Sequence, residues 1–266
     1  MSRNDTHQAR KRFGQNFLHD QYVIQKIVNA ISPTLEQTLV EIGPGKGAIT
    51  SLLIQNCKEL HVIEIDRDLV ALLKNKFLHT PNLQIHTRDA LHFDYCSLVQ
   101  NNKLRLMGNL PYNISTPLLF HLLENSNCIE DMHFMLQKEV VDRMAAMPGS
   151  RDYGRLSVMI QYQCHVDALF NVGPGAFTPA PKVDSTIVRL EPYTDKPVEV
   201  SNTQIFQRIV TQAFSLRRKT IRNALKRMLG EKQIRDCSID PDLRPEMLGV
   251  EDYARLAEYM AKQERL

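Results

Sequence analysis

Short apolar runs alternate with helix-like segments between about residue 38 and residue 191. Alternating strands and helices are typical of a mostly parallel sheet that helices cover on both faces, so we predict an α/β fold. The runs that we interpret as strands are TLVEIG (38–43), LHVIEID (60–66), LQIHTRDA (83–90), LRLMGNL (104–110), MHFMLQ (132–137) and STIVRLEP (185–192).

The segments between these runs carry apolar residues at three- and four-residue spacing, which predicts covering helices. They are AITSLLIQNC (48–57), RDLVALLKNKF (67–77) and TPLLFHLLEN (116–125). The segment NVGPGAFTPAPKVDS (171–185) breaks the pattern, because glycines and prolines surround Phe177. We expect a stiff loop there, which positions a side chain.

The strand pattern stops after about residue 200, and helical periodicity replaces it. We therefore predict two domains: residues 1–196 as the α/β domain, and residues 197–266 as a small helical domain. The apolar positions that follow the helical period are Phe206, Ile209, Val210, Ala213, Phe214, Ile221, Ala224, Leu225 and Met228.

Composition agrees with this division. The chain has 266 residues, of which 43% are hydrophobic, and this is enough for one large and one small core. The formal net charge is only +3, so the whole-chain charge argues weakly for a nucleic-acid partner. Evidence for a nucleic-acid partner must therefore come from the local distribution of charge along the chain.

One stretch of the helical domain, residues 205–230, is basic and contains no Asp or Glu. Arg218, Arg222 and Lys226 are four residues apart, so we expect them to share one face of a helix. A run of this kind can be an ordinary solvated face. The absence of acidic residues favours a surface that binds phosphates.

The five cysteines are odd in number and widely spaced, and they include no CxxC pair. This pattern fits reduced thiols in a cytosolic protein, and we expect neither a zinc site nor any other metal site. The amino terminus lacks the apolar core of a signal peptide, and no run approaches the ~18 apolar residues of a membrane span. We therefore expect a soluble, cytoplasmic protein.

Glycines 43, 45 and 47 follow the first predicted strand in VEIGPGKGAIT (40–50). Such glycines let the backbone pass close to a ligand before a helix. The same residues satisfy a dinucleotide fingerprint, and Glu64 at the end of the next strand could hold a ribose in either case. The glycine loop alone therefore does not identify the cofactor.

Asp89 and Ala90 stand at the end of the third strand. Three consecutive strand ends therefore supply a glycine loop, a carboxylate that could bind a ribose (Glu64) and a carboxylate that could bind the edge of a purine (Asp89). That combination suits an adenosine with a small charged tail, such as S-adenosylmethionine. A single Asp is often only a helix cap, and the case depends on the joint placement.

The stretch GNLPYNIS (108–115) places an amide and a phenol directly after the strand LRLM. The oxygens of the Asn109 side chain and the Leu110 backbone could accept hydrogens from an adenine amino group, which would expose its lone pair to a sulfonium methyl. Pro111 would fix the turn, and Tyr112 would offer a stacking face. The alternative is a simple strand-ending turn. Phe177 is a candidate second wall for the base, although a single Phe is usually part of a core.

An ordered set of motifs resembles the bacterial small-subunit ribosomal RNA adenine dimethyltransferases, the KsgA/RsmA family, from about residue 10 to residue 250. The resemblance implies a class I, Rossmann-like methyltransferase fold with a mainly parallel seven-stranded sheet and a helical carboxyl-terminal domain. The motifs are GQNFL, EIGPGKGAIT, VIEIDRDL, RDA, GNLPYNISTPLLF, MLQKEV, YGRLSV, FTPAPKVDS and RRKTIRNAL.

The resemblance also implies an activity. S-adenosylmethionine would be the methyl donor, and two adjacent adenines near the 3′ end of 16S rRNA would each be methylated twice. The substrate would be a late assembly intermediate of the small ribosomal subunit, and we expect the enzyme to act as a monomer.

The family pattern assigns roles residue by residue. Gly45 in the glycine loop and Ala90 beside Asp89 are further candidates for the donor site. The family pattern itself places Asn16 and Leu18 on the donor, together with Gly43, Glu64 and Asp89, and it gives Asn109 to both the donor pocket and the target amino group. It makes Tyr112 and Phe177 the two faces that hold the target base, beside Leu110 and Pro111. The basic residues that would face RNA are Arg10, Lys11, Arg12, Arg217, Arg218, Lys219, Arg222 and Lys226.

Three alternatives stay open from the sequence. A related enzyme that methylates one adenine of large-subunit RNA shares the glycine loop and the Asn-x-Pro-Tyr motif, although FTPAPKVDS and RRKTIRNAL favour the small-subunit branch. A nicotinamide-dependent dehydrogenase would need the glycine loop but not Asn109 and Tyr112 together. A ribosome assembly factor with secondary enzymatic activity would use overlapping surfaces.

Overall fold

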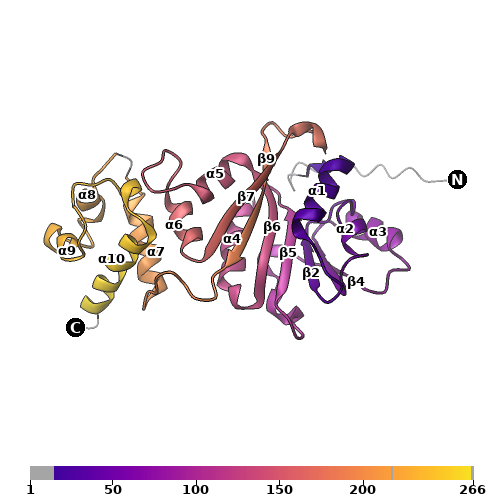
Figure 1. The fold of residues 1–266 in the computed structure, drawn as a ribbon, viewed down its shortest axis with the longest axis horizontal. Helices are drawn as coiled ribbons and strands as arrows, with labels where there is room; N and C mark the ends of the chain where they lie inside the picture. The colour runs from indigo at the N-terminus through magenta and orange to yellow at the C-terminus, as the bar shows by residue number, and fades with distance from the viewer. Residues whose placement is uncertain (1–14, 217, 265–266) are drawn as a thin grey trace. The chain divides into compact units, whose positions relative to one another are not determined.

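The computed structural model describes residues 15–216 and 218–264, and Figure 1 shows their fold. The described chain forms two compact units. The first holds residues 15–138 and Asp167–Pro192, and the second holds Glu139–Val166 and the chain from Tyr193 onward. The boundary that we predicted after residue 196 lies near the last point at which the chain passes between the units, from Pro192 to Tyr193. The sequence did not suggest that Glu139–Val166 joins the carboxyl-terminal unit.

The main sheet has seven strands in the order β4-β3-β2-β5-β6-β9-β7. The strands from β4 to β6 in this order pair in parallel, whereas β9 pairs antiparallel with β6. The predicted α/β fold with a mainly parallel seven-stranded sheet is therefore confirmed. The strands are β2 (Thr38–Ile42), β3 (Glu59–Glu64), β4 (Leu83–Thr87), β5 (Leu104–Asn109), β6 (Ile129–Gln137), β7 (Cys164–Val172) and β9 (Ser185–Pro192).

Each run interpreted as a strand from the sequence overlaps one of these strands, but β7 was missed. Several of its residues are exposed, so it lacks the continuous apolar run of a central strand. The predicted helix over residues 48–57 is reduced to α2 (Thr50–Leu53), while α3 (Arg67–Lys76) and α4 (Ser115–Glu124) lie where helices were expected.

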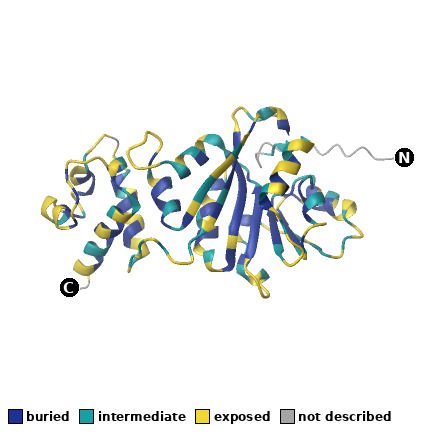
Figure 2. Ribbon diagram, in the orientation of Figure 1, coloured by how far each residue is buried: buried dark blue, intermediate teal, exposed yellow. Residues whose placement is uncertain are grey.

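Helix α1 (Gln21–Ile31) covers one face of the sheet, and the sequence analysis did not identify it. Its buried residues Ile24, Ile27, Val28 and Ile31 have the spacing of a single helix face. They join a core cluster that contains residues of α2, β2, β3, β5, β6 and β9, and Figure 2 shows these strands as buried. The Asp20 carboxylate caps the helix by accepting the Val23 N–H at 3.1 Å.

A buried ion pair fixes the other end of α1. Two guanidinium nitrogens of Arg105 on β5 donate to the carboxylate of Asp131 on β6, each at 2.9 Å. The same guanidinium donates to the backbone oxygens of Ile31 and Ser32, which are left unpaired where the helix ends. The sheet therefore holds the helix that follows the segment Gln15–Leu18.

A second, two-stranded sheet joins distant parts of the chain. Strand β1 (Phe17–Leu18) pairs antiparallel with β8 (Phe177–Thr178), and Leu18 lies opposite Phe177. The stiff loop predicted over residues 171–185 contains β8. The middle of this loop is therefore paired with the segment in which the family pattern places donor-binding residues.

The second unit is mainly helical, as predicted for the carboxyl-terminal region. Helix α7 contacts α6, α8 and α10, and the Tyr162 ring lies 4.5 Å from that of Phe206. The Tyr253 hydroxyl donates to the backbone oxygen of Pro245 at 2.8 Å. The helices are α5 (Lys138–Ala145), α6 (Arg155–Gln161), α7 (Thr203–Ala213), α8 (Ile221–Leu225), α9 (Glu231–Asp236) and α10 (Val250–Gln263).

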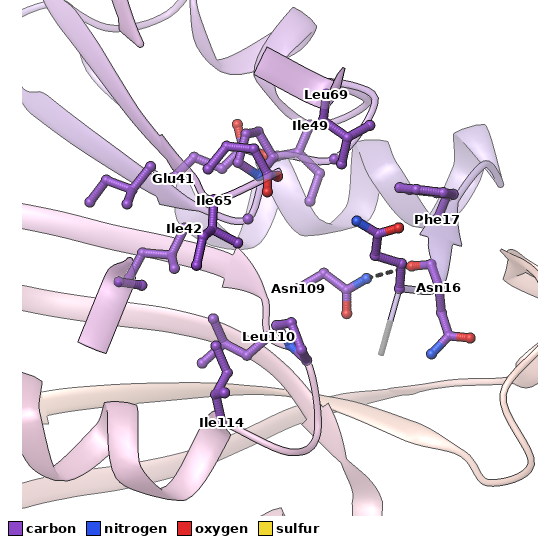
Figure 3. Close-up of a pocket in the computed structure, with 18 of the residues that line it drawn as sticks. Asn16, Phe17, Glu41, Ile42, Ile49, Ile65, Leu69, Asn109, Leu110 and Ile114 are labelled. Atoms are coloured by element: carbon purple, nitrogen blue, oxygen red, sulfur yellow. Dashed lines mark hydrogen bonds between the residues drawn. The ribbon is translucent and has the colours of Figure 1, made fainter. Parts of the chain in front are cut away.

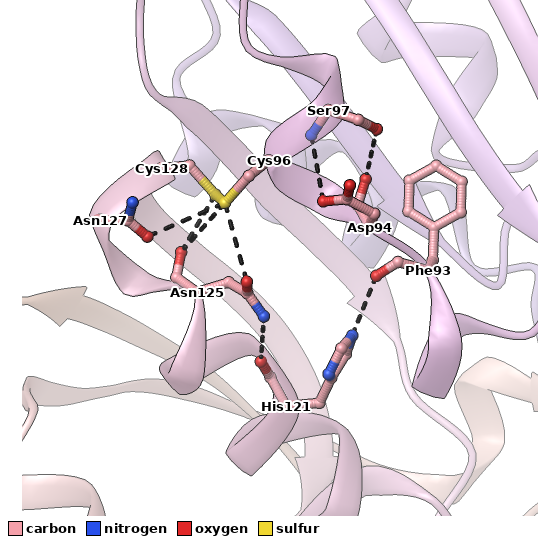
Figure 4. The surroundings of a disulfide bond; sticks show 8 residues. All are labelled: Phe93, Asp94, Cys96, Ser97, His121, Asn125, Asn127 and Cys128. Carbon is pink, nitrogen blue, oxygen red and sulfur yellow. Dashed lines mark hydrogen bonds between the residues drawn. A yellow bond between two sulfur atoms is a disulfide. The ribbon is translucent and has the colours of Figure 1, made fainter.

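The expectation that all cysteines are reduced thiols is wrong for two of them. Cys96 and Cys128 form a disulfide between two short 3-10 helices, η3 (Tyr95–Leu98) and η4 (Ser126–Cys128), as Figure 4 shows. The pair was missed because its members are 32 residues apart in sequence and only the fold brings them together. Cys57, Cys164 and Cys237 are free and buried. Within the described chain, no helix has the length and apolarity needed to cross a membrane.

Candidate active site

A pocket lies beyond the carboxyl ends of the central parallel strands (Figure 3), where ligands bind in open α/β sheets. Every residue that we predicted to hold the donor lines it, and so does the whole turn from Asn109 to Tyr112. The predicted residues in its wall are Asn16, Leu18, Gly43, Gly45, Glu64, Asp89, Ala90, Asn109, Leu110, Pro111 and Tyr112.

The glycine loop after β2 adopts backbone conformations that other residues rarely reach. Gly43, Gly45 and Gly47 have φ angles of 67°, 58° and 71°. A Cβ on Gly45 would lie 3.1 Å from the ring of Phe17. The Lys76 ammonium donates to the backbone oxygens of Lys46 and Gly47 at 3.1 and 3.0 Å. The loop is thus anchored to α3 through Lys76 and packed closely against Phe17.

Glu41 lies beneath this loop and was not predicted as a site residue. The residue is part of the pocket wall although it is only 2% exposed. Burial raises the pKa of the Glu41 carboxyl to about 7, against the opposing effect of the hydrogen bond that it accepts from the Thr50 hydroxyl. The Glu41 carboxyl therefore keeps its proton to a higher pH than an exposed glutamate does.

Glu64 ends β3 with its carboxylate held by backbone donors. The N–H of Asp66 donates to it at 2.9 Å, and the N–H groups of Gly45 and Ile65 bond to it as well. Burial is the main influence and raises the pKa of Glu64, while these hydrogen bonds lower it. The next residue, Ile65, is apolar yet 47% exposed, and it lines the pocket. Its exposure next to a strand-end acid is a feature that only the structure reveals.

Asp89 occupies the end of β4, and it also caps a short 3-10 helix, η2 (Ala90–His92). One carboxylate oxygen accepts the Leu91 N–H at 2.9 Å, and the other lies 3.4 Å from His92 Nδ1. Helix capping and a place in the pocket wall are therefore both true of Asp89. The Tyr95 hydroxyl donates to the Ala90 backbone oxygen at 3.0 Å and keeps this segment against the sheet.

The segment Gln15–Leu18 closes the pocket from the amino-terminal side. The Gln15 side-chain amide donates to the Asp66 carboxylate at 3.2 Å, and the Lys46 ammonium lies 5.0 Å from the centre of the Phe17 ring. Gln15 and Phe17 both line the pocket, although the sequence analysis singled out only Asn16 and Leu18. Their contribution depends on contacts with residues far away in sequence.

The turn after β5 presents Asn109 to the pocket. Gly108 is required before it, because a Cβ there would lie 2.4 Å from the Ile42 backbone oxygen. The Asn109 Nδ2 donates to the Asn16 backbone oxygen at 3.0 Å, as the dashed line in Figure 3 shows. The backbone N–H of Leu110 donates to Met135 at 3.2 Å. The amide nitrogen is thus used, which leaves the side-chain oxygen as the group that can accept.

Tyr112 is half-buried, and its hydroxyl lies 3.2 Å from the Ser185 hydroxyl. Phe177, the predicted second wall of the base site, is placed differently. It is only 4% exposed, belongs to the core cluster with Leu18, and is not part of the pocket wall. The structure therefore brings Tyr112 to the pocket but not Phe177.

The predicted RNA-facing residues are only partly described. Arg10, Lys11, Arg12 and Arg217 lie outside the described residues. The expectation that Arg218, Arg222 and Lys226 share one helix face is wrong, because α8 spans only Ile221–Leu225. Arg218 precedes it with a left-handed φ of 64°, and Lys226 is the residue at which it ends.

Arg222 is also paired with acids that lie outside the basic run. It contacts the Asp242 carboxylate at 3.0 Å and that of Glu231 at 3.5 Å. Arg218, Lys219 and Lys226 are exposed. Among the residues that the structure describes, no group of three or more potential ligands could hold a metal ion.

Comparison with known proteins adds independent information. The profile of a family described as "Ribosomal RNA adenine dimethylase" matches residues 6–262. A protein of Marinobacter nauticus named "Ribosomal RNA small subunit methyltransferase A" is 54% identical, and the alignment covers 100% of this chain and 96% of that protein. A Pseudomonas aeruginosa protein of the same name is 55% identical, with 98% of each covered.

Solved structures agree with this result. A dimethyladenosine transferase from Plasmodium falciparum superposes with a TM-score of 0.80 at 26% identity, covering 93% of this chain and 98% of that one. The 23S rRNA methyltransferase ErmE shares the fold, with a TM-score of 0.72 at 24% identity and coverage of 92% and 100%.

Proposed function

Because the chain belongs to the ribosomal RNA adenine dimethylase family, we propose that its pocket binds S-adenosylmethionine and delivers methyl groups to two adjacent adenines of 16S rRNA. The adenines lie near the 3′ end of the RNA, and each exocyclic amino group receives two methyls. The family makes the protein a methyltransferase that uses a donor of this type, which excludes the dehydrogenase alternative. The names of its bacterial relatives support the small subunit as the source of the RNA.

The residues present fit this donor. Gly43 and Gly45 would hold its amino-acid tail at the loop, Glu64 its ribose, and Asp89 with Ala90 the edge of its adenine. Ile65 offers an exposed apolar surface for the same base. When bound, the donor supplies a methyl group that the positive charge on sulfur activates. The protein and the RNA must supply the rest, which is the position and orientation of the target amino group.

The orientation of Asn109 is the observation that carries the proposal. Its Nδ2 is held by the Asn16 backbone oxygen at 3.0 Å, so Oδ1 can accept a hydrogen from the amino group of the target adenine. The Leu110 backbone oxygen would accept the second hydrogen. An amino nitrogen held in this way presents its lone pair, and preorganised acceptors lower the barrier without having to reorient.

The target base would have to leave its helix to reach these oxygens. Tyr112 would stack on it, and such stacking contributes roughly 1–3 kcal/mol per base. Phe177 would form the second face only if it left the core in which it now packs. The exposed Arg218, Lys219 and Lys226, with the basic residues outside the described chain, would contact RNA phosphates.

The remaining parts of the proposal concern the particle that presents the RNA, the oligomeric state of the enzyme and its cellular compartment. The RNA substrate would be presented by a late assembly intermediate of the small ribosomal subunit, and the enzyme would act on it as a monomer in the cytoplasm. An assembly function would use the same RNA-binding surface and is compatible with catalysis.

Mass spectrometry of rRNA tests the proposal. Small subunits that lack the modification are incubated with the enzyme and labelled S-adenosylmethionine, with large-subunit RNA in a parallel reaction and the Asn109→Ala variant as control. We expect two dimethyladenines in the small-subunit RNA and no transfer by the variant. Label confined to large-subunit RNA, or absent from both RNAs, would refute the proposal.

A further inference from the structure

We propose that Ser185 is a positioning residue of the methyl transfer: its hydroxyl holds the ring of Tyr112 at the position where the target adenine stacks on it. The inference rests on the proposed function, and it adds a residue outside the pocket wall. Ser185 is the last residue of the loop motif FTPAPKVDS and the first residue of β9.

The contact that carries the inference joins two hydroxyl groups. The Tyr112 hydroxyl lies 3.2 Å from Ser185 Oγ, a hydrogen-bonding distance. Ser185 is only 1% exposed and lies opposite Gln137 in the β6–β9 pairing, so the sheet fixes its position. The Lys138 N–H donates to the Asp184 backbone oxygen at 2.9 Å and extends this pairing. Ser185 is therefore a rigid anchor rather than a mobile loop residue.

Tyr112 is held at its other end by a second buried serine. The Ser115 hydroxyl donates to the Tyr112 backbone oxygen at 3.2 Å, and Ser115 is 3% exposed. The turn fixes the Cα of the tyrosine, and Ser185 fixes the far end of its ring. Together they fix both ends of the side chain and so restrict its χ1 torsion, which means that a stacking base does not have to order the position of the ring.

The same anchor connects Tyr112 to the donor side of the site. Asn16 holds the Asn109 amide, and the residues after it form β1, which pairs with β8. The loop from β8 leads to Ser185, which holds Tyr112. The two side chains of the catalytic turn, Asn109 and Tyr112, are thus oriented by two segments that pair with each other. Because Ser185 itself contacts Tyr112 and lies outside the pocket wall, a change at Ser185 should affect the transfer step more than donor binding.

A purely structural role would give a different result, and a matched control separates the two. Thr186, the next residue on β9, is also buried, and its hydroxyl donates to Asn171 at 2.8 Å. Thr186→Val removes a buried hydroxyl from the same strand without touching Tyr112. Ser185→Ala should lower the single-turnover rate about fivefold while the Kd for S-adenosylmethionine is unchanged. Thr186→Val should leave both values near those of the wild type.

A double-mutant cycle with Tyr112→Phe gives the second readout, since this change removes the same bond from the other side and keeps the ring. Ser185→Ala should have no further effect on the rate in the Tyr112→Phe background. Additive losses, or a Ser185→Ala variant with the rate of Thr186→Val, would overturn the inference while leaving the proposed function intact. A wild-type enzyme that transfers no methyl group would overturn both.

Discussion

Asn109 Nδ2 donates to the backbone oxygen of Asn16 at 3.0 Å, so a residue outside the sheet sets the orientation of the amide at the end of β5. The two residues are separated by 93 positions in sequence. An amide can be flipped without changing its shape, and here one contact determines which atom faces the pocket. Because the nitrogen is engaged, the oxygen is available for an adenine amino group.

This relationship predicts that Asn109→Asp is harmful although the two side chains have nearly the same shape. A carboxylate cannot donate to the Asn16 oxygen, and its negative charge would face that oxygen. We expect the single-turnover transfer rate to fall by at least 10²-fold, as for the loss of a preorganised polar group in other enzymes. Asn56→Asp is a matched control, because the Asn56 amide also donates to a backbone oxygen, that of Leu52, but outside the pocket. An Asn109→Asp enzyme as active as this control would contradict the assigned orientation.

Tyr112 and Phe177 should separate in their effects, because the structure places one in the pocket wall and the other in the core. Phe177→Ala removes a ring that is 4% exposed and should lower the free energy of unfolding by about 3 kcal/mol. Tyr112→Ala should cost less stability but should strongly reduce methyl transfer. Urea unfolding and single-turnover kinetics on both variants measure this contrast. Equal stability losses would mean that Tyr112 also acts mainly as a core residue.

The parallel strands and the pocket were predictable because the relevant signals are local. Apolar runs mark the parallel strands, and the ends of such strands meet at one edge, so Glu64, Asp89 and Asn109 could be brought together from sequence alone. Helix α1 had a usable signal that was overlooked: Asp20 is a good cap, and the buried positions from Ile24 onward have helical spacing.

Other features depend on contacts that no local pattern encodes. The apolar spacing between Ala213 and Ile221 suggests a continuous helix, but the chain turns there and Arg218 adopts a left-handed conformation. Phe177 has the sequence context of an exposed loop, yet pairing of its strand with β1 brings it into the core. The Cys96–Cys128 disulfide and the buried Glu41 likewise follow from the tertiary arrangement.

The raised pKa of Glu41 predicts a pH dependence of stability. The carboxyl loses its proton near pH 4.5 when unfolded but near pH 7 when folded, so the folded state binds more protons in this window. Stability should therefore fall as the pH rises from 4.5 to 7, and this shift corresponds to on the order of 3 kcal/mol.

Glu41→Gln should remove that contribution, because a neutral amide keeps an oxygen for the Thr50 hydroxyl. The free energy of unfolding of the variant, measured relative to wild type, should rise between pH 4 and pH 8. A difference that stays constant over this range would show that Glu41 titrates normally.

The Cys96–Cys128 disulfide closes a 32-residue separation and should stabilise the folded state by about 3–4 kcal/mol in the chain-entropy description. Oxidised wild-type protein should therefore unfold at a higher urea concentration than Cys96→Ser. Dithiothreitol should lower the wild-type midpoint and leave that of Cys96→Ser unchanged. A reductant effect of equal size on both proteins would argue that another group is responsible.

The basic residues around α8 should contribute unequally to RNA binding, because Arg222 already pairs with Asp242 and Glu231. The exposed Arg218 has no such pairing among the ion pairs of the described chain. Each phosphate contact that is lost lowers the slope of log K against log salt by roughly 0.7–0.9. Arg218→Ala should therefore flatten the slope by about one unit.

Arg222→Ala should flatten the slope less, because the Arg222 guanidinium already pairs with Asp242 and Glu231 and is less available to a phosphate. Filter binding of small-subunit RNA over a range of salt concentrations measures both slopes. Arg208→Ala is a suitable comparison, because this exposed arginine lies within helix α7, ten residues before Arg218, and contacts Glu264 at 3.5 Å. If Arg218→Ala changed the slope no more than Arg208→Ala, the turn before α8 would not be part of the RNA-binding surface, and the phosphate contacts would have to come from other basic residues.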